Sequence, residues 1–381
     1  MRRGSAWPEL KPAARSETRL DGGCTVHFAC QDARVRVLAD TERAEARAIW
    51  TELEAAHGAP SLTCSWAWTG TWLEHYGDVV PHRFLVGEGG IALVTEGPRR
   101  SLRPRTLHLG TAGEPAGEGV FVERNRLLVA EAERTAFAAA LVDHLLAERG
   151  WDVLALDGMH LEDADALLAG RSGVTREPDD CPIADLRDGE DVLDALSSSR
   201  RQRIRRTLRA FGELESDWAQ TAVEAEAILD DLIALHQQRW TEAGESGAFA
   251  SERFTAFHRA LVARLVPERR AALLRVRRGE EVVGCLYGLI DGERLLFYQG
   301  GLRRYEDNKL KAGVAAHATF MRACCERGLA VYDFLAPVTR YKEELSTRTE
   351  PLVWARLERP TWRTRLGHVV HAVRRTSGGD S

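Results

Sequence analysis

The apolar and polar residues between Glu281 and Leu345 follow a pattern that predicts a strand, a tight turn and a second strand. Val282–Leu289 is mostly apolar over the length of a buried strand. Asp291–Gly292 is a dipeptide that tolerates positive φ and therefore favours a hairpin turn. Leu295–Gly300 is the predicted second strand, so this stretch begins with a β-hairpin.

A polar loop, a helix and another strand are predicted after the hairpin. The loop Arg303–Lys311 is rich in charged residues. Gly313 begins the predicted helix, which runs to about Glu326 and ends at Gly328. Ala330–Leu335 returns as a strand. A helix that begins at a small residue after such a loop can bind phosphate through its free backbone N–H groups.

The first half of the chain alternates segments of strand and helix periodicity. The predicted strands are Cys24–Leu38, His82–Val86, Ile91–Thr95, Leu107–Leu109, Trp151–Leu156 and Cys181–Leu186, and the predicted helices are Thr41–His57, Ser61–Tyr76, Ala132–Glu148 and His160–Leu168. Trp66, Trp68 and Trp72 lie in one of these helices, and rings of this size belong more often to a core than to a binding surface. This mixture predicts an α/β fold with mixed sheets.

A strongly basic helix is predicted between the two halves. Within Asp188–Gly212, six arginines surround an apolar stripe that includes Ile204 and Phe211. Two interpretations are open: the helix is solvated and bridges the halves, or it faces the phosphates of a nucleotide-bearing partner. Ala222–Arg239 and Phe254–Leu265 are the next predicted helices.

At 381 residues the chain is long enough for two domains of ordinary size. The predicted organisation is a disordered tail at 1–24, an N-terminal domain at 25–187, a C-terminal domain at 188–358 and a basic amphipathic tail at 359–381. Apolar residues such as Trp362 and Leu366 recur at helical spacing among arginines in the last segment. Residues 359–375 are therefore expected either to rest on an anionic membrane surface or to dock on their own protein.

Composition argues against several classes of function. The net charge of −5 provides no general attraction to nucleic acid or acidic membranes. No apolar run has the length of a transmembrane helix or of a signal peptide. The seven cysteines form no CxxC pair and the histidines are scattered, which predicts reduced thiols, a cytoplasmic protein and no metal site. HExxH, P-loop, Rossmann and GxSxG motifs are absent.

Lysine is rare in this chain and concentrated in one stretch. Of the 52 basic residues, four are lysines, and Lys309, Lys311 and Lys342 all lie between Glu281 and Leu345. The fourth, Lys11, lies in the N-terminal tail. This distribution is either a coincidence within an arginine-rich composition or a sign that a compact, titratable amine is needed there.

Four short motifs in the same stretch carry a family resemblance. They are Phe297–Gly301 (FYQGG), Lys311–Gly313 (KAG), Tyr332–Leu335 (YDFL) and Tyr341–Lys342 (YK). In their order and spacing they resemble the core of GNAT acyltransferases, most closely the CelD-like branch named for cellulose and exopolysaccharide biosynthesis loci. The last two motifs also resemble Fem-type peptidyltransferases. The resemblance implies two tandem GNAT-like domains with a boundary near Asp188 and the site in the second.

Acyl transfer from a thioester needs a place for the donor's phosphates, a hydrogen-bond donor to the oxyanion and a base near the acceptor. The residues expected to bind the donor, acyl-CoA and most simply acetyl-CoA, are Gln299, Gly300, Lys309, Lys311 and Gly313. The catalytic candidates are Asp333 as base, Lys342 as the group that stabilises the oxyanion or binds phosphate, and Tyr341 beside it. The acceptor candidates are Arg239, Trp240 and Tyr298.

Each of the main candidates has a structural alternative. Asp333 could be a buried, hydrogen-bonded carboxylate, Tyr298 a core ring and Lys342 a surface charge. The resemblance implies an acyltransferase acting on an amine or hydroxyl of a sugar or cell-envelope precursor. A Fem-type transferase that uses aminoacyl-tRNA, with the basic helix lining its channel, is an alternative. A catalytically degenerate scaffold in a polysaccharide-producing assembly is another.

Overall fold

The computed structural model describes residues 35–57, 61–186 and 191–368. All of them belong to one compact unit, Ala33–Ser381. The predicted tail at 1–24 and the predicted boundary at Asp188 lie outside the described residues, as does the end of the basic tail beyond His368. We call 35–186 the first half and 191–368 the second half.

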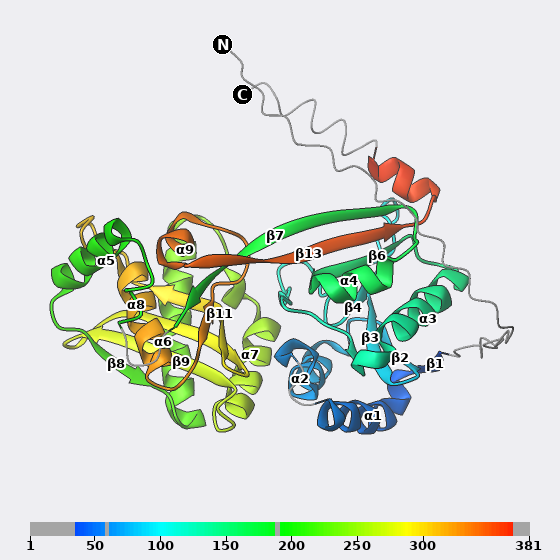
Figure 1. The fold of residues 1–381 in the computed structure, drawn as a ribbon, viewed down its shortest axis with the longest axis horizontal. Coiled ribbons are helices and arrows are strands. Elements are labelled where there is room, and N and C mark those ends of the chain that lie inside the picture. Colours follow the sequence, from blue (N-terminus) through cyan, green and yellow to red (C-terminus); the bar gives the residue numbers. More distant parts are fainter. Residues whose placement is uncertain (1–34, 58–60, 187–190, 369–381) are drawn as a thin grey trace, which may run out of the picture. The chain divides into compact units, whose positions relative to one another are not determined.

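The first half begins with short strands and two helices and ends with a long strand (Figure 1). Its elements are β1 (Arg36–Leu38), α1 (Arg43–Ala56), α2 (Trp66–Tyr76), β2 (His82–Gly87), β3 (Gly90–Glu96), β4 (Thr106–Leu109), β5 (Leu128–Val129), α3 (Arg134–Ala147), β6 (Val153–Met159), α4 (Leu161–Leu168) and β7 (Val174–Asp185). The helices and strands predicted here are confirmed where they are described, but β7 begins seven residues before its predicted start at Cys181. Its N-terminal part is largely exposed, so the apolar signal appears only near its end.

The second half contains the predicted hairpin, helix and strand. Its elements are α5 (Ser198–Phe211), β8 (Glu215–Trp218), α6 (Ala222–Glu242), α7 (Glu252–Leu265), β9 (Ala271–Arg278), β10 (Glu281–Asp291), β11 (Arg294–Leu302), α8 (Ala312–Cys325), β12 (Val331–Asp333), α9 (Arg340–Leu345) and β13 (Arg348–Glu358). Gly292 has φ +59 in the predicted hairpin turn. Thr221 and Glu224 form a capping box that begins α6. The short helix α9 was not predicted.

Within the described residues, thirteen strands form one mixed sheet in the order β1-β2-β3-β4-β6-β13-β7-β12-β11-β10-β9-β8, with β5 beside β3. Each half has four antiparallel strands, β1-β2-β3-β4 in the first and β8-β9-β10-β11 in the second. A helix and a strand that runs parallel to the fourth follow: β4 pairs with β6, and β11 with β12. The final strands are exchanged. β7 pairs with β12 of the second half, and β13 pairs with β6 of the first.

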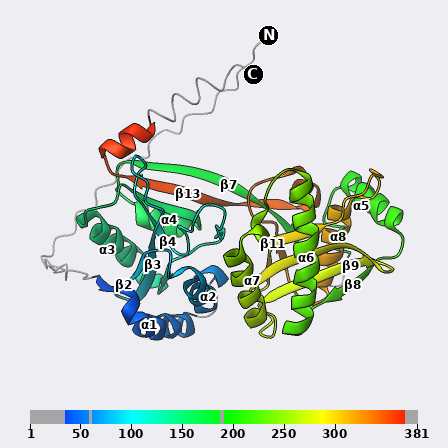
Figure 2. The same cartoon turned by 180° about the vertical axis from the view of Figure 1, so that it is seen from behind.

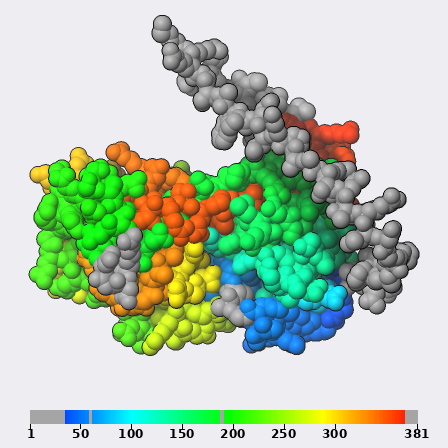
Figure 3. Space-filling view, in the orientation of Figure 1, coloured from blue at the N-terminus to red at the C-terminus, as the bar shows by residue number. Residues whose placement is uncertain are grey.

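The exchanged strands connect the two halves. β7 and β13 run antiparallel along ten paired residues (Figures 1 and 2), and atoms of β13 lie at the surface in orange-red in Figure 3. The expected mixed α/β fold with two similar halves is thus confirmed. The two halves share a similar order of strands and helices but no repeated sequence, because a similar fold needs only a similar pattern of buried and exposed positions.

Aromatic residues from both halves pack in one core. Trp68 and Trp72 on α2 are fully buried, as predicted, and the Trp68 ring meets Phe257 of α7 edge-on at 5.3 Å between centroids. The Trp68 indole N–H donates to Thr111 at 2.7 Å and the Trp72 indole N–H donates to Glu114 at 2.7 Å. Buried indoles with satisfied N–H groups are structural, so these tryptophans form a core and not a binding surface.

Gly301 allows β11 to lie directly on α6. A Cβ atom added at Gly301 would stand 2.2 Å from the backbone oxygen of Leu232. We expect Gly301→Ala to lower the free energy of unfolding by about 1–3 kcal/mol, measured by urea denaturation, because the helix backbone must move away. Gly119→Ala is the control, since nothing lies within 4 Å of its added Cβ. Equal stability of the two variants would contradict the close packing.

Candidate active site

The candidate site lies where β11 and β12 separate. The two strands pair only from Arg294 to Leu296 against Val331 to Asp333. β12 ends there, whereas β11 continues to Leu302 and leaves one edge without a strand partner. A cavity of about 420 Å³ opens at this point. Its walls are largely aromatic, and its polar side chains are Glu123, Asp179, Tyr298, Gln299, Tyr341 and Lys342.

A β-bulge shapes the β11 side of the cavity. Tyr287 of β10 faces Gln299 whereas Gly288 faces Phe297, so Tyr298 is an extra residue without a partner on β10. The Tyr298 ring lies 4.8 Å from the His258 ring, and its hydroxyl is buried without a hydrogen-bond partner. Tyr298 therefore contributes to both the core and the cavity wall. The residue pattern along β11 does not predict the bulge.

The β12 side of the cavity is a turn held by Lys342. Leu335 has φ +57, a conformation that costs energy in a residue with a side chain. The Lys342 ammonium on α9 donates to the carbonyl of Leu335 at 2.8 Å and to that of Ala336 at 3.1 Å. Lys342 is 7% exposed, so it is not a surface charge. Burial lowers the pKa of its ammonium, and the nearby Glu123 opposes this shift.

Glu123 reaches the cavity from the first half. Its Oε2 accepts the N–H of Ala336 at 2.7 Å. Burial is the largest influence on this carboxyl and raises its pKa to about 7. Nothing in the sequence predicts a role for Glu123, because its contact with Ala336 joins positions 213 residues apart. No local pattern carries that information.

Asp333 lies beneath the cavity in a network of charges. Its Oδ2 is 2.6 Å from the Arg124 guanidinium and accepts a hydrogen bond from Arg294 at 3.0 Å. Its Oδ1 accepts the N–H of Leu335 at 2.9 Å. Glu350 joins the same two arginines, at 2.8 and 3.0 Å. Asp333 is fully buried and its oxygens are occupied, so this geometry favours its structural role, and its role as base stays a prediction.

Tyr341 lies between the cavity and a buried histidine. Its ring stacks on His317 at 5.4 Å between centroids, with 26° between the planes. Burial raises the pKa of the Tyr341 phenol to about 12. The phenol is therefore a proton donor, not an anion, at neutral pH.

Residues 198–343 match the family model described as an acetyltransferase (GNAT) domain. The second half carries a GNAT domain. The GNAT resemblance expected from the sequence is thus confirmed, and the CelD-like branch stays a prediction. No match was found among curated proteins.

Solved structures share the fold of both halves. FemX is 12% identical and has a TM-score of 0.53 over 84% of this chain and 96% of its own. The C-terminal domain of a putative lysylphosphatidylglycerol synthetase from Agrobacterium fabrum is 12% identical, with a TM-score of 0.52 over 87% of this chain and 96% of its own. L-PGS from Bacillus licheniformis is 14% identical, with a TM-score of 0.51 over 88% of this chain and 97% of its own. At such identities the likeness concerns the fold alone.

A second hollow of the GNAT domain, a groove of about 540 Å³, lies beside the loop that follows β11. Arg239, Arg303 and Arg304 line it. The loop leads to Lys311, the N-cap residue of α8, which makes no side-chain cap, so the first N–H groups of α8 have no capping side chain. Such N–H groups and arginines suit phosphate.

The structure separates the predicted binding residues into these two places. Gln299, Tyr298, Tyr341 and Lys342 line the cavity. Lys309 and Lys311 are exposed on the loop near the groove, and Gly313 lies in the first turn of α8. Arg239, predicted beside the acceptor, lines the groove instead. Trp240 is 41% exposed and lies against His236, outside both hollows.

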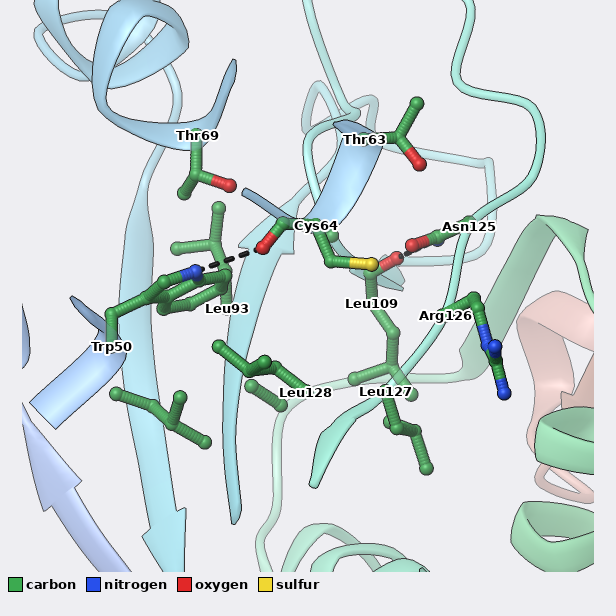
Figure 4. A pocket seen from close by; sticks show the side chains of 13 residues that line it. Trp50, Thr63, Cys64, Thr69, Leu93, Leu109, Asn125, Arg126, Leu127 and Leu128 are labelled. Carbon is green, nitrogen blue, oxygen red and sulfur yellow. Dashed lines mark hydrogen bonds between the residues drawn. The ribbon is translucent and has the colours of Figure 1, made fainter. Parts of the chain in front are cut away.

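In the described part of the first half, the corresponding gap between the parallel strands β4 and β6 is filled by a side chain. Asn125 donates to the carbonyls of Leu109 at the end of β4 (2.8 Å) and of Asp157 on β6 (3.4 Å). The void that remains beside Leu109 and Cys64 is about 20 Å³, the size of a single water (Figure 4). Burial raises the pKa of the Cys64 thiol to about 12, so it is not a reactive thiolate at neutral pH. Among the described residues, the strand gap of the first half is therefore filled, whereas that of the second half is open.

The arginines of α5 are mostly engaged within the protein. Arg203 pairs with Glu344 at 2.8 Å, and Arg205 pairs with Asp191 and Asp194 at 3.2 and 3.1 Å. Arg200 donates to the carbonyl of Ser346. All of these partners lie in the second half, so the contacts favour a structural role for α5 over a surface that faces the phosphates of a nucleotide-bearing partner, and they show no bridge to the first half.

Proposed function

We propose that this chain is an acyltransferase that takes an acyl group from acyl-CoA, with acetyl-CoA as the first candidate. The acceptor is an amine or hydroxyl of a sugar or of a cell-envelope or exopolysaccharide precursor. The proposal rests on the cavity where β11 and β12 separate. The buried Lys342 ammonium and the protonated Tyr341 phenol line this cavity beside the unpaired edge of β11. The GNAT match supports the same chemistry.

The residues offer the interactions that a thioester donor requires. The Gly300 N–H donates to the side chain of its neighbour Gln299 at 3.2 Å, a weak local bond that a ligand carbonyl can replace. Lys342 uses two of its three N–H groups on carbonyls, which leaves one for the oxyanion. The groove with Arg239, Arg303 and Arg304 would hold the phosphates of CoA. When bound, acyl-CoA supplies an activated acyl carbon with a good leaving group.

The walls of the cavity support a sugar-like acceptor. Phe254, Phe297, Phe334 and Trp354 supply rings that pack against the apolar faces of a sugar, and Asp179 and Glu123 supply carboxylates for its amine or hydroxyl groups. No metal-binding cluster of His, Cys, Asp or Glu occurs among the described residues.

Membrane contact through 359–375 stays part of the proposal. In the described part of this segment, Trp362 is 55% exposed, and the Arg363 guanidinium stacks over its ring at 4.5 Å. None of the helices in the described ranges is both long and apolar enough to cross a bilayer. Surface attachment would therefore rest on this amphipathic segment.

Acetyl-CoA should raise the Tm of the protein in a thermal-shift assay, because a ligand that binds the native state stabilises it, by about 2.7 kcal/mol at 100 times its Kd. Acetyl-pantetheine, which lacks the nucleotide phosphates, should raise the Tm less. Longer acyl-CoAs report the tolerated acyl length. A shift with tRNA alone, lost at high salt, would instead support the Fem-type alternative. No shift with any of these ligands would contradict the enzyme and favour the scaffold.

A further inference from the structure

We propose that Glu123, supplied by the first half, is the proton acceptor of the acyl-transfer site in the second half. This inference rests on the proposed function. The first half would then contribute a catalytic residue to the site of the second half, although its own gap between β4 and β6 is filled.

The backbone holds the Glu123 carboxylate from one side only. Oε2 accepts the Ala336 N–H at 2.7 Å, and the carbonyl of the same Ala336 accepts Lys342 at 3.1 Å. Oε1 accepts no hydrogen bond from any described residue, and Glu123 lines the cavity. One oxygen is thus anchored and the other is available to a bound acceptor, which is the geometry required of a general base.

The neighbouring Arg124 fixes the segment that carries Glu123. Arg124 has φ +60, and its carbonyl accepts the hydroxyls of Ser61 at 2.8 Å and Thr63 at 3.0 Å. Arg124 is 5% exposed, and its guanidinium pairs with Asp333 at 2.6 Å and with Glu350 at 2.8 Å. Glu123 therefore lines the cavity, whereas Arg124 belongs to the charge network with Asp333 and Glu350.

The surroundings of Glu123 suit a base that works near neutral pH. Burial raises its pKa to about 7, and Asp333 on β12 acts in the same direction. Lys342 on α9 and Arg124, the next residue in the chain after Glu123, lower the pKa of Glu123. On β7, the Cys181 thiol lies 4.0 Å from Oε2, and Asp179 lines the same cavity. A base whose pKa is near the working pH combines availability with strength.

The other candidate bases among the described residues fit less well. Asp333 has both oxygens occupied. His258 does not line the cavity, and burial lowers its pKa to about 3. His317 is fully buried against Tyr332, and burial likewise lowers its pKa to about 3. Asp179 lines the cavity but accepts no hydrogen bond that would orient it.

The step balances without any further reactant. The acceptor N–H or O–H passes its proton to Oε1 of Glu123 while its lone pair forms a bond to the thioester carbonyl carbon. The C–S bond then breaks, and its electron pair leaves with the CoA sulfur, which takes up a proton from solvent. Glu123 returns its proton to solvent, so acyl-CoA and acceptor give acylated acceptor and free CoA.

The test compares wild type, Glu123→Gln and Asp180→Asn over pH 5.5–9. Asp180 is exposed, precedes Cys181 on β7 and lies outside the cavity, so its variant removes one nearby negative charge and no base. CoA release from acetyl-CoA is measured with glucosamine and with water as probe acceptors. We expect E123Q to lose at least about 100-fold in rate, together with the wild-type rise in rate through about pH 7. D180N should keep both, and acetyl-CoA should still raise the Tm of E123Q.

Stability provides a second readout. Glutamine mimics the protonated carboxyl, so E123Q and wild type should have similar Tm values at pH 4, where Glu123 is mainly protonated in both the folded and the unfolded chain. At pH 8 native Glu123 is ionised at a cost that the unfolded chain does not bear, so E123Q should have the higher Tm. The variant is thus expected to be more stable and less active than wild type, a pair of effects that a merely structural glutamate would not produce.

The outcomes separate this inference from the function on which it rests. A rate for E123Q within threefold of an active wild type, or a Tm gap that does not grow between pH 4 and pH 8, overturns the role of Glu123 alone. Wild-type protein that neither binds acetyl-CoA nor releases CoA overturns the acyltransferase function and this inference with it.

Discussion

Replacing Lys342 with methionine should lower the rate of CoA release from acetyl-CoA by about 1000-fold, the upper range for loss of one preorganised oxyanion donor. Methionine has similar length and no N–H group. Its introduction removes the hydrogen bond proposed for the oxyanion and the two bonds to Leu335 and Ala336. The turn that carries Ala336 also anchors Glu123, so the proposed base loses its alignment at the same time.

The same variant should be less stable than wild type. Each carbonyl left without a partner in the buried turn costs about 1–3 kcal/mol. Lys309→Met is the control for stability alone, because Lys309 is exposed on the loop before α8 and makes no side-chain hydrogen bond in the described structure. Urea denaturation measures stability, and the rate assay is run well below the Tm of each variant. Normal turnover by K342M would remove Lys342 from the proposed mechanism.

Replacing Asp333 with alanine should lower the free energy of unfolding by about 3–5 kcal/mol, the cost of breaking a buried ion pair on one side. Asp333 is fully buried between Arg124 and Arg294. Without its carboxylate both guanidinium groups face only Glu350, and the N–H of Leu335 loses its acceptor. The loss is large because water cannot readily replace the missing charge.

Glu45→Gln is the matched control for Asp333→Ala. Glu45 pairs with Arg36 at the surface, where both side chains are about half exposed, and such a pair contributes less than about 1 kcal/mol. If Asp333 acts through structure, the folded fraction of D333A at low temperature should retain measurable turnover. Complete loss of turnover with unchanged stability would instead support Asp333 as the base and contradict the role of Glu123 as proton acceptor.

The exchanged strands explain why the two halves act as one unit. β7 completes the sheet of the second half beside β12, and β13 completes that of the first beside β6. The charge network of Arg124, Asp333, Arg294 and Glu350 lies across the same connection. The first half therefore shapes the site through strand pairing, through buried charge and through Glu123.

The sequence by itself determined the local elements and the class of fold. The hairpin around Gly292, the helix α8 and the strand β12 follow from periodicity and turn residues, which act over a few positions. The rarity of lysine drew attention to Lys342, but it did not reveal that the ammonium is buried and holds a turn.

The tertiary structure decided the membership of the site. The cavity depends on where the pairing of β11 with β12 stops and on a bulge at Tyr298, and both are set by neighbouring strands. The apolar residues around Asp333 in the sequence already predict that it is buried. Only the fold shows that its carboxylate pairs with Arg124 and Arg294. Glu123 comes from another half of the chain, and no sequence period extends over 213 residues. Burial and pairing between distant segments, which no local pattern encodes, therefore decide which side chains face the cavity.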